Sequence, residues 1–155
     1  DGHVHDDLRD KPAPSIAPSL YCILSGYAET RPVPETRQLI SFEQLHGGRA
    51  YHGAFTRRAI QPLEKAFGSD PLALYEASRL FDAVRLSHGD CSVKISSLPL
   101  VPITIVLWSA SPEFPASANV LFDSSISNYL STEQIAMLSE LTGARLRLAH
   151  EIVKA

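Results

Sequence analysis

The chain has 155 residues, of which 45% are hydrophobic and 20% charged, and its formal net charge at pH 7 is −3. Such a chain buries roughly two-thirds of its unfolded surface and needs no metal or disulfide to hold a core. The mildly acidic charge argues against nucleic-acid binding, which requires a basic face. No apolar run reaches the roughly 18 residues of a membrane span. The two cysteines, Cys22 and Cys91, make neither a zinc knuckle nor an iron–sulfur ligand set and fit a reducing compartment, so we expect a cytoplasmic protein.

The N-terminal part of the chain divides into a polar arm and a helix. Residues 1–18 are polar and proline-marked, which predicts an extended or disordered arm, followed by a single α+β domain over residues 19–155. Apolar residues between Ile16 and Tyr27 recur at helical spacing, with Pro18 in the first turn. Residues 39–42 predict a short extended segment, and two glycines at 47 and 48 mark the turn after it.

Two helices are expected next. Residues 52–68 form an amphipathic pattern, which Pro62 should kink or divide and which Gly68 should end. Asp70 and Pro71 then predict the N-cap and first position of a second helix. The apolar residues of the first pattern recur about every four positions: Tyr51, Phe55, Ala59, Leu63 and Phe67.

The pattern then changes to the period of β-strands. Apolar residues alternate over residues 84–88 and 91–95, and the intervening Gly89 and Asp90 predict a hairpin turn. Residues 103–108 are a continuous apolar run, which is typical of a central strand covered on both faces. Residues 119–122 predict a shorter strand.

The chain ends in a predicted long helix. Ser131 and Gln134 form a capping box at its start, and Gly143 lowers its stability somewhat. The order of elements indicates an α+β fold, with a small, mainly antiparallel sheet packed by helices and a long C-terminal helix. The expected buried stripe of this last helix is Ile135, Leu138, Leu141, Leu146, Ala149 and Ile152.

Three segments carry a family resemblance: ISFEQLHGGRAYHGAFTRRAIQPLEKAFG, SSLPLVPITIVLW and SPEFPASANVLFDSSISNYLSTEQIAMLSEL. They are similar to the bacterial and archaeal family catalogued as domain of unknown function 3786, over roughly residues 39–141. The linked set VPITIVLW, EFPA, NVLFD and YLSTE is the most specific part, whereas His46 stands where the family usually has proline. The resemblance implies a protein of anaerobic microbes, associated with corrinoid or one-carbon enzymes. Some relatives add a four-cysteine iron–sulfur segment, which this chain lacks, so direct electron transfer is in doubt here.

The first candidate site is the N-terminus. If Asp1 carries a free amine, that amine, two backbone amides and the His3 imidazole predict a square-planar site for Cu(II) or Ni(II). His5 adds a further donor. The alternative is an arm without a metal role.

The second candidate site is the turn that holds His46, Arg49, Tyr51 and His52 before a helix. Backbone N–H groups at a helix start attract anions, and more arginines follow in the helix, so a phosphate or carboxylate site is one hypothesis. His46 or His52 as a metal or haem ligand is another. The alternative is a turn followed by a solvated basic helix face.

The third candidate site lies where the apolar strands meet their loop, and it holds Trp108, Glu113, Phe114 and Asp123. Prolines at 112 and 115 stiffen this loop into a pocket wall or a protein-binding edge. Glu113 and Asp123 would do acid–base work if they shared a desolvated cleft. The alternative is that Asp123 caps the turn that follows it and that Glu113 is solvated.

These observations favour a non-catalytic binding or accessory protein, associated with a larger enzyme or redox complex of anaerobic metabolism through the proline-framed loop. One alternative is a tetrapyrrole- or corrinoid-binding domain with His46 or His52 as the axial ligand. Another is a small hydrolase or transferase that uses Glu113 and Asp123. The preferred hypothesis requires that Ile105 be buried and that the loop after its strand be exposed.

Overall fold

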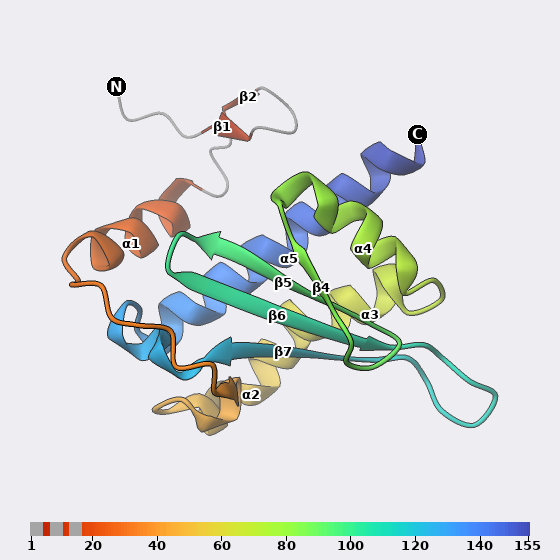
Figure 1. Ribbon diagram of the computed structural model, residues 1–155, viewed down its shortest axis with the longest axis horizontal. Helices are drawn as coiled ribbons and strands as arrows, with labels where there is room; N and C mark the ends of the chain where they lie inside the picture. Colours follow the sequence, from red (N-terminus) through yellow and green to blue (C-terminus); the bar gives the residue numbers. More distant parts are fainter. Residues whose placement is uncertain (1–4, 7–10, 13–16) are drawn as a thin grey trace.

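The computed structural model describes residues 5–6, 11–12 and 17–155, and it shows an α+β fold (Figure 1). A five-stranded antiparallel sheet has the order β3-β7-β6-β5-β4, and helices lie behind it in this view. The strands are β3 (Leu39–Ser41), β4 (Val84–Leu86), β5 (Cys91–Leu98), β6 (Val101–Trp108) and β7 (Ser117–Asp123). Two two-residue strands, β1 (His5–Asp6) and β2 (Lys11–Pro12), pair separately.

The helices are α1 (Ala17–Ala28), α2 (Gly48–Phe55), α3 (Gln61–Phe67), α4 (Leu72–Ser78) and α5 (Thr132–Lys154). Most of the predicted N-terminal arm, residues 1–18, lies outside the described residues. Its last two residues are helical, because α1 begins at Ala17 and places Pro18 in its first turn. In the described part of the chain, no helix is both long and apolar enough to cross a membrane.

The strand β6 is central, as the apolar run predicts. Ile103, Ile105 and Leu107 alternate towards the helices, and Ile105 is 1% exposed. Thr104 and Val106 point to the opposite face, where no helix covers them, yet both are buried. The β4–β5 turn approaches Val106 closely, since a Cβ added at Gly89 would lie 2.8 Å from the Val106 side chain.

An extended segment, residues 31–38, lies along the face of the sheet that the helices leave open, and we call it the strap. Its backbone is tied at both ends: Tyr129 donates to and accepts from Val33 at 3.0 and 2.9 Å, and Asp123 accepts from the N–H groups of Thr36 and Arg37. Between them, the Glu35 carboxylate pairs with Lys94 of β5 at 2.6 Å. The strap therefore borders the face of the sheet that has no helix layer, and a hollow lined by Glu35, Lys94 and Thr104 remains between them.

The predicted helix over residues 52–68 begins earlier and is interrupted. It starts as α2 at Gly48, widens into a π-helical segment at Thr56–Ile60, and resumes as α3 with Pro62 in its first turn. Proline lacks an N–H and crowds the carbonyl four residues back, so the wider turn, in which Gln61 N–H bonds Thr56 O, accommodates it. The prediction that Pro62 divides the helix is confirmed, although the irregularity lies just before it.

Two details of the helix predictions are wrong. Asp70 does not cap α4 through its side chain; the N-cap position is Pro71, and Asp70 contributes only a backbone carbonyl to Ala73. Ile152 is 44% exposed rather than buried, because the last turns of α5 extend past the body of the protein (Figure 1). The capping box at the start of α5 is confirmed, with Ser131 and Gln134 bonding reciprocally.

Candidate functional site

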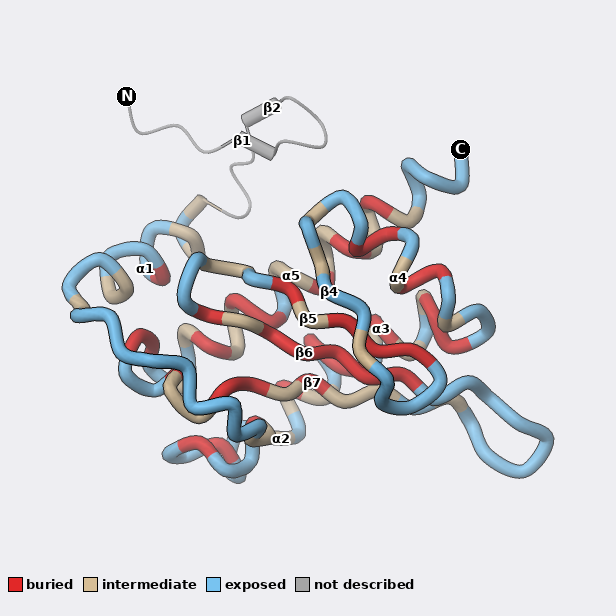
Figure 2. Tube along the Cα trace, viewed as in Figure 1, coloured by how far each residue is buried: buried red, intermediate tan, exposed pale blue. Residues whose placement is uncertain are grey.

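The loop between β6 and β7, residues 109–116, projects away from the body of the protein (Figures 1 and 2). Phe114 near its tip is 69% exposed, the most of any large apolar side chain in residues 17–155. Trp108, at the end of β6, is 42% exposed. Aromatic side chains held in water in this way are typical of residues that a partner later buries.

Hydrogen bonds fix the base of this loop. The Asp90 carboxylate in the β4–β5 turn accepts from the backbone N–H and the hydroxyl of Ser109 at 2.6 and 2.9 Å, and these bonds lower the Asp90 pKa. On the other side, Ala110 N–H donates to Gly68 O at 3.3 Å. The loop is thus held from two neighbouring turns.

A closed turn fixes the tip of the loop. Ser111 N–H donates to Phe114 O at 2.8 Å, and the Ser111 hydroxyl accepts from Phe114 N–H at 3.1 Å and Glu113 N–H at 3.3 Å. With Pro112 between them, these bonds hold the backbone beneath Phe114 in one conformation. The aromatic ring is therefore presented from a preorganised backbone, which lowers the entropic cost of binding a partner.

The structure does not bring Glu113 and Asp123 together. Glu113 lies exposed at the loop tip, whereas Asp123 lies at the far end of the seven-residue strand β7, whose length alone is roughly 20 Å. No shared cleft exists for acid–base work by this pair.

Asp123 instead anchors the strap. Its carboxylate is 2% exposed and accepts from Thr36 N–H (3.1 Å), Thr36 hydroxyl (3.1 Å) and Arg37 N–H (2.7 Å). It also accepts from the N–H and hydroxyl of Ser125, so it caps the turn that follows β7 as the alternative reading predicts. Burial alone would raise the Asp123 pKa, but the bonds from Ser125 and Thr36 outweigh it and lower the pKa to about 2. A carboxylate held ionised in this way is a structural acceptor, not a proton donor near neutral pH.

His52 lies in α2 beside Glu43 and Thr56, but the three do not form a relay. Glu43 Oε1 is 3.1 Å and Thr56 Oγ1 is 3.4 Å from the same ring nitrogen, Nε2. A nucleophile–base–acid relay needs its two partners on different nitrogens. The other nitrogen, Nδ1, is buried and has no hydrogen-bond partner.

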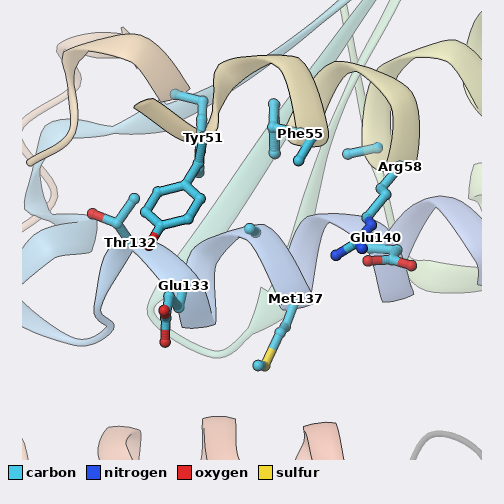
Figure 3. A pocket seen from close by; sticks show the side chains of 11 residues that line it. Tyr51, Phe55, Arg58, Thr132, Glu133, Met137 and Glu140 are labelled. Carbon is cyan, nitrogen blue, oxygen red and sulfur yellow. The ribbon is translucent and has the colours of Figure 1, made fainter. Parts of the chain in front are cut away.

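The remaining residues of the predicted turn site point to different surroundings. His46 and Arg49 are exposed, and His46 uses its backbone carbonyl to accept from Thr132 at 2.7 Å. Tyr51 instead lines a cavity of about 290 Å³ between α2 and α5 (Figure 3). Neither His46 nor His52 lines that cavity.

Figure 3 shows the character of this cavity. Its lining combines the apolar side chains of Phe55 from α2 and Met137 from α5 with the charged side chains of Arg58, Glu133 and Glu140, and Arg58 and Glu140 lie next to each other. The π-helical segment supplies part of its wall. A volume of this size is at the lower end of small-molecule sites.

The predicted N-terminal metal site cannot be placed. His3 lies outside the described residues, and His5 is described only as part of the backbone of β1. Within the described residues, no group of three or more histidine, cysteine, aspartate or glutamate side chains is arranged to hold a metal ion. Cys91 is buried, and this burial raises its thiol pKa, which makes the sulfur unreactive.

A family model described as "Domain of unknown function (DUF3786)" matches residues 3–145 of the 155-residue chain. The chain belongs to the DUF3786 family. This confirms the resemblance seen in the strand and loop motifs. No curated protein and no solved structure gives a significant match. The family description assigns no activity to DUF3786 proteins, so function must be argued from the structure of this chain.

Sequence reasoning did not single out the residues that support the loop. The sequence pattern places Asp90 in a turn and Ser111 in a loop. Their role in holding the β6–β7 loop is shown only by the hydrogen bonds of Asp90 with Ser109 and of Ser111 with Phe114. One signal was available: serine or aspartate next to proline and glycine is typical of side chains that bond nearby backbone. That signal does not identify the partner.

Proposed function

We propose that this DUF3786 protein is a non-catalytic binding or accessory protein and that it docks on a larger protein through the β6–β7 loop. The observation that carries the proposal is the 69% exposed Phe114 on a backbone that Ser111 and Asp90 hold rigid. Exposing a phenylalanine opposes the hydrophobic effect, and burial of such a ring contributes about 1.5–3 kcal/mol to an interface.

Trp108 extends the proposed surface. It lies at the end of β6, and its ring is close to the β4–β5 turn, since a Cβ atom built on Gly89 would lie 3.3 Å from it. The β4–β5 turn therefore packs against the Trp108 ring. Trp108 and Phe114 thus stand at the base and near the tip of one loop, and tryptophan and other aromatic residues are enriched at the centres of protein interfaces.

The class of partner rests on the family resemblance. DUF3786 members of anaerobic microbes suggest a larger enzyme or redox complex of anaerobic metabolism as the partner. In such a complex this chain would contribute recognition or assembly, because Glu113 and Asp123 are separated and Glu43, His52 and Thr56 form no relay.

Site-specific cross-linking in the native cell tests the proposal. A photoreactive phenylalanine analogue replaces Phe114, and in a matched control it replaces Leu24, which is 43% exposed. Leu24 belongs to α1, a helix at the opposite end of the molecule from the β6–β7 loop (Figure 1). We expect one discrete larger adduct from position 114 that position 24 does not give. Phe114→Ser should abolish co-purification of the same protein while leaving the thermal midpoint unchanged.

Two results would contradict the proposal. One is a chain recovered only as a free monomer, with no adduct from position 114. The other is an adduct equally strong from position 24, which would indicate random collision rather than docking.

A further inference from the structure

A second surface of the protein concentrates positive charge. A groove of about 690 Å³ runs between the π-helical segment with α3 on one side and the C-terminal half of α5 on the other. Its charged and polar lining side chains are Arg57, Gln61, Lys65, Arg147, His150, Glu151 and Lys154.

The groove arises from two helical rows that face each other. Arg57, Gln61 and Lys65 are four residues apart along one row, and Arg147 and Lys154 are seven apart, with His150 between them, along the other. Side chains three, four or seven apart share one face of a helix, so both rows point into the same groove. Two arginines and two lysines thus face one carboxylate, in a chain whose formal net charge is −3.

These cations lack carboxylate partners. Within residues 17–155, none of Arg57, Lys65, Arg147 and Lys154 takes part in an ion pair; the pairs formed are His52–Glu43, Arg79–Glu76 and Lys94–Glu35. Arg147 Nε is buried and has no hydrogen-bond partner. The guanidinium of Arg147 therefore has no acceptor within the described residues.

The nearest acidic residue of α3 is directed elsewhere. Glu64 is next to Lys65 in sequence, but its carboxylate accepts from Ala118 N–H of β7 at 3.0 Å. Glu64 therefore binds the backbone of β7 and does not neutralise the positive charge of the groove. His150 packs its ring on Phe67 with centroids 5.2 Å apart, so it is held in place at the groove wall.

We propose that this groove binds a small ligand that carries a multiply charged phosphate group, such as a diphosphate. Guanidinium groups match phosphate oxygens by paired N–H donors, and ammonium groups add charge around them. Cations on both walls of a cleft focus the field between them, which suits one compact anion of high charge.

The proposal is independent of the β6–β7 loop. The α5 wall, from Arg147 onward, lies beyond the residues 3–145 that the family model matches, whereas Arg57 and Lys65 lie within them. Loss of ligand binding would leave docking through Phe114 intact, and the reverse also holds.

Titration of the full chain with inorganic pyrophosphate tests this inference. Isothermal calorimetry and backbone amide NMR are recorded at an ionic strength of about 150 mM, at which exposed charges more than about 8 Å apart are largely screened. We expect saturable binding, with the largest amide shifts in α3 and in the second half of α5. Raising the salt concentration should weaken the binding.

Charge-removing variants locate the site. Arg147→Gln and Lys65→Gln should each raise the pyrophosphate Kd roughly tenfold, as expected for loss of one charge-assisted contact. If Arg147→Gln unfolds the protein, Arg57→Gln replaces it as the test variant, because Arg57 is exposed. The matched control is Arg79→Gln, directly after the end of α4, which removes the same charge from an arginine already paired with Glu76 and should change Kd less than about twofold.

Several results would overturn the proposal. These are no saturable binding of pyrophosphate, equal affinity in the groove variants and the Arg79→Gln control, or sulfate binding as tightly as pyrophosphate, which would indicate non-specific attraction. Duplex DNA that binds the groove while pyrophosphate does not would also refute it and would assign the surface to nucleic acid.

Discussion

The substitution Asp123→Asn should destabilise the protein because five donors converge on this carboxylate. An asparagine side chain has one acceptor oxygen and presents an N–H₂ group in the other position. At least one of the N–H groups of Thr36, Arg37 and Ser125 then faces another donor in a buried site. A buried donor left unsatisfied in this way costs about 1–3 kcal/mol, and losing the charged acceptor adds to it, so we expect a loss of about 2–4 kcal/mol at pH 7.

The pH dependence of this loss gives a sharper test. The Asp123 pKa falls from 3.8 to about 2 on folding, so the ionised carboxylate contributes roughly 2 kcal/mol of stability at neutral pH. Because the folded-state pKa is lowered, this contribution is present above about pH 5 and is lost as the pH falls towards 2. The asparagine variant has no such group, so the difference in unfolding free energy between wild type and variant should shrink by roughly 2 kcal/mol over that range.

Urea unfolding at several pH values between 2 and 6 measures this difference directly. Glu113→Gln is the matched control, since it neutralises an exposed loop carboxylate and should change stability by less than about 0.5 kcal/mol at any pH. A wild-type-minus-variant difference that stays constant from pH 6 to pH 2 would refute the assignment of Asp123 as an ionised anchor of the strap.

Three further outcomes follow from the packing. Gly143→Ala should stabilise the protein by about 0.5–1 kcal/mol in thermal or urea unfolding, because alanine favours the helix α5 and its Cβ would lie 3.6 Å from the Leu63 side chain of α3, an ordinary contact distance. Destabilisation would mean that α3 and α5 leave no room for the added methyl group. Ser111→Ala should speed amide hydrogen exchange at Phe114 without moving the unfolding midpoint by more than a few degrees, and unchanged exchange would show that the hydroxyl does not hold the loop. Ile105→Ala should cost about 2–5 kcal/mol by urea unfolding, and a cost below about 1 kcal/mol would contradict a central, fully packed β6.

The sheet was predictable because its strands have local signatures. Alternating apolar residues in β5, the continuous apolar run of β6, and the turn at Gly89 and Asp90 each depend on neighbours within a few positions. The same holds for the capping box of Ser131 and Gln134, which spans four residues. Ile152 was misjudged because helical periodicity gives the face of a residue but not whether the core extends that far.

The candidate sites were less predictable because they depend on contacts between distant parts of the chain. The sequence allowed Glu113 and Asp123 to act as an acid–base pair, but the extended strand β7 between them keeps the two carboxylates apart. Asp123 finds its partners at Thr36 and Arg37, 87 and 86 residues away, which no local pattern reports.

The sequence by itself determined the order of helices and strands, the buried central strand and the exposed proline-framed loop, since these follow from short-range periodicity and turn chemistry. Only the tertiary structure decided which side chains meet: the strap on Asp123, the turn beneath Phe114, and the facing cations Lys65 and Arg147. The physical reason is that hydrophobic patterning sets which face of each element is buried, whereas the partners on the other faces are set by how those elements pack against each other.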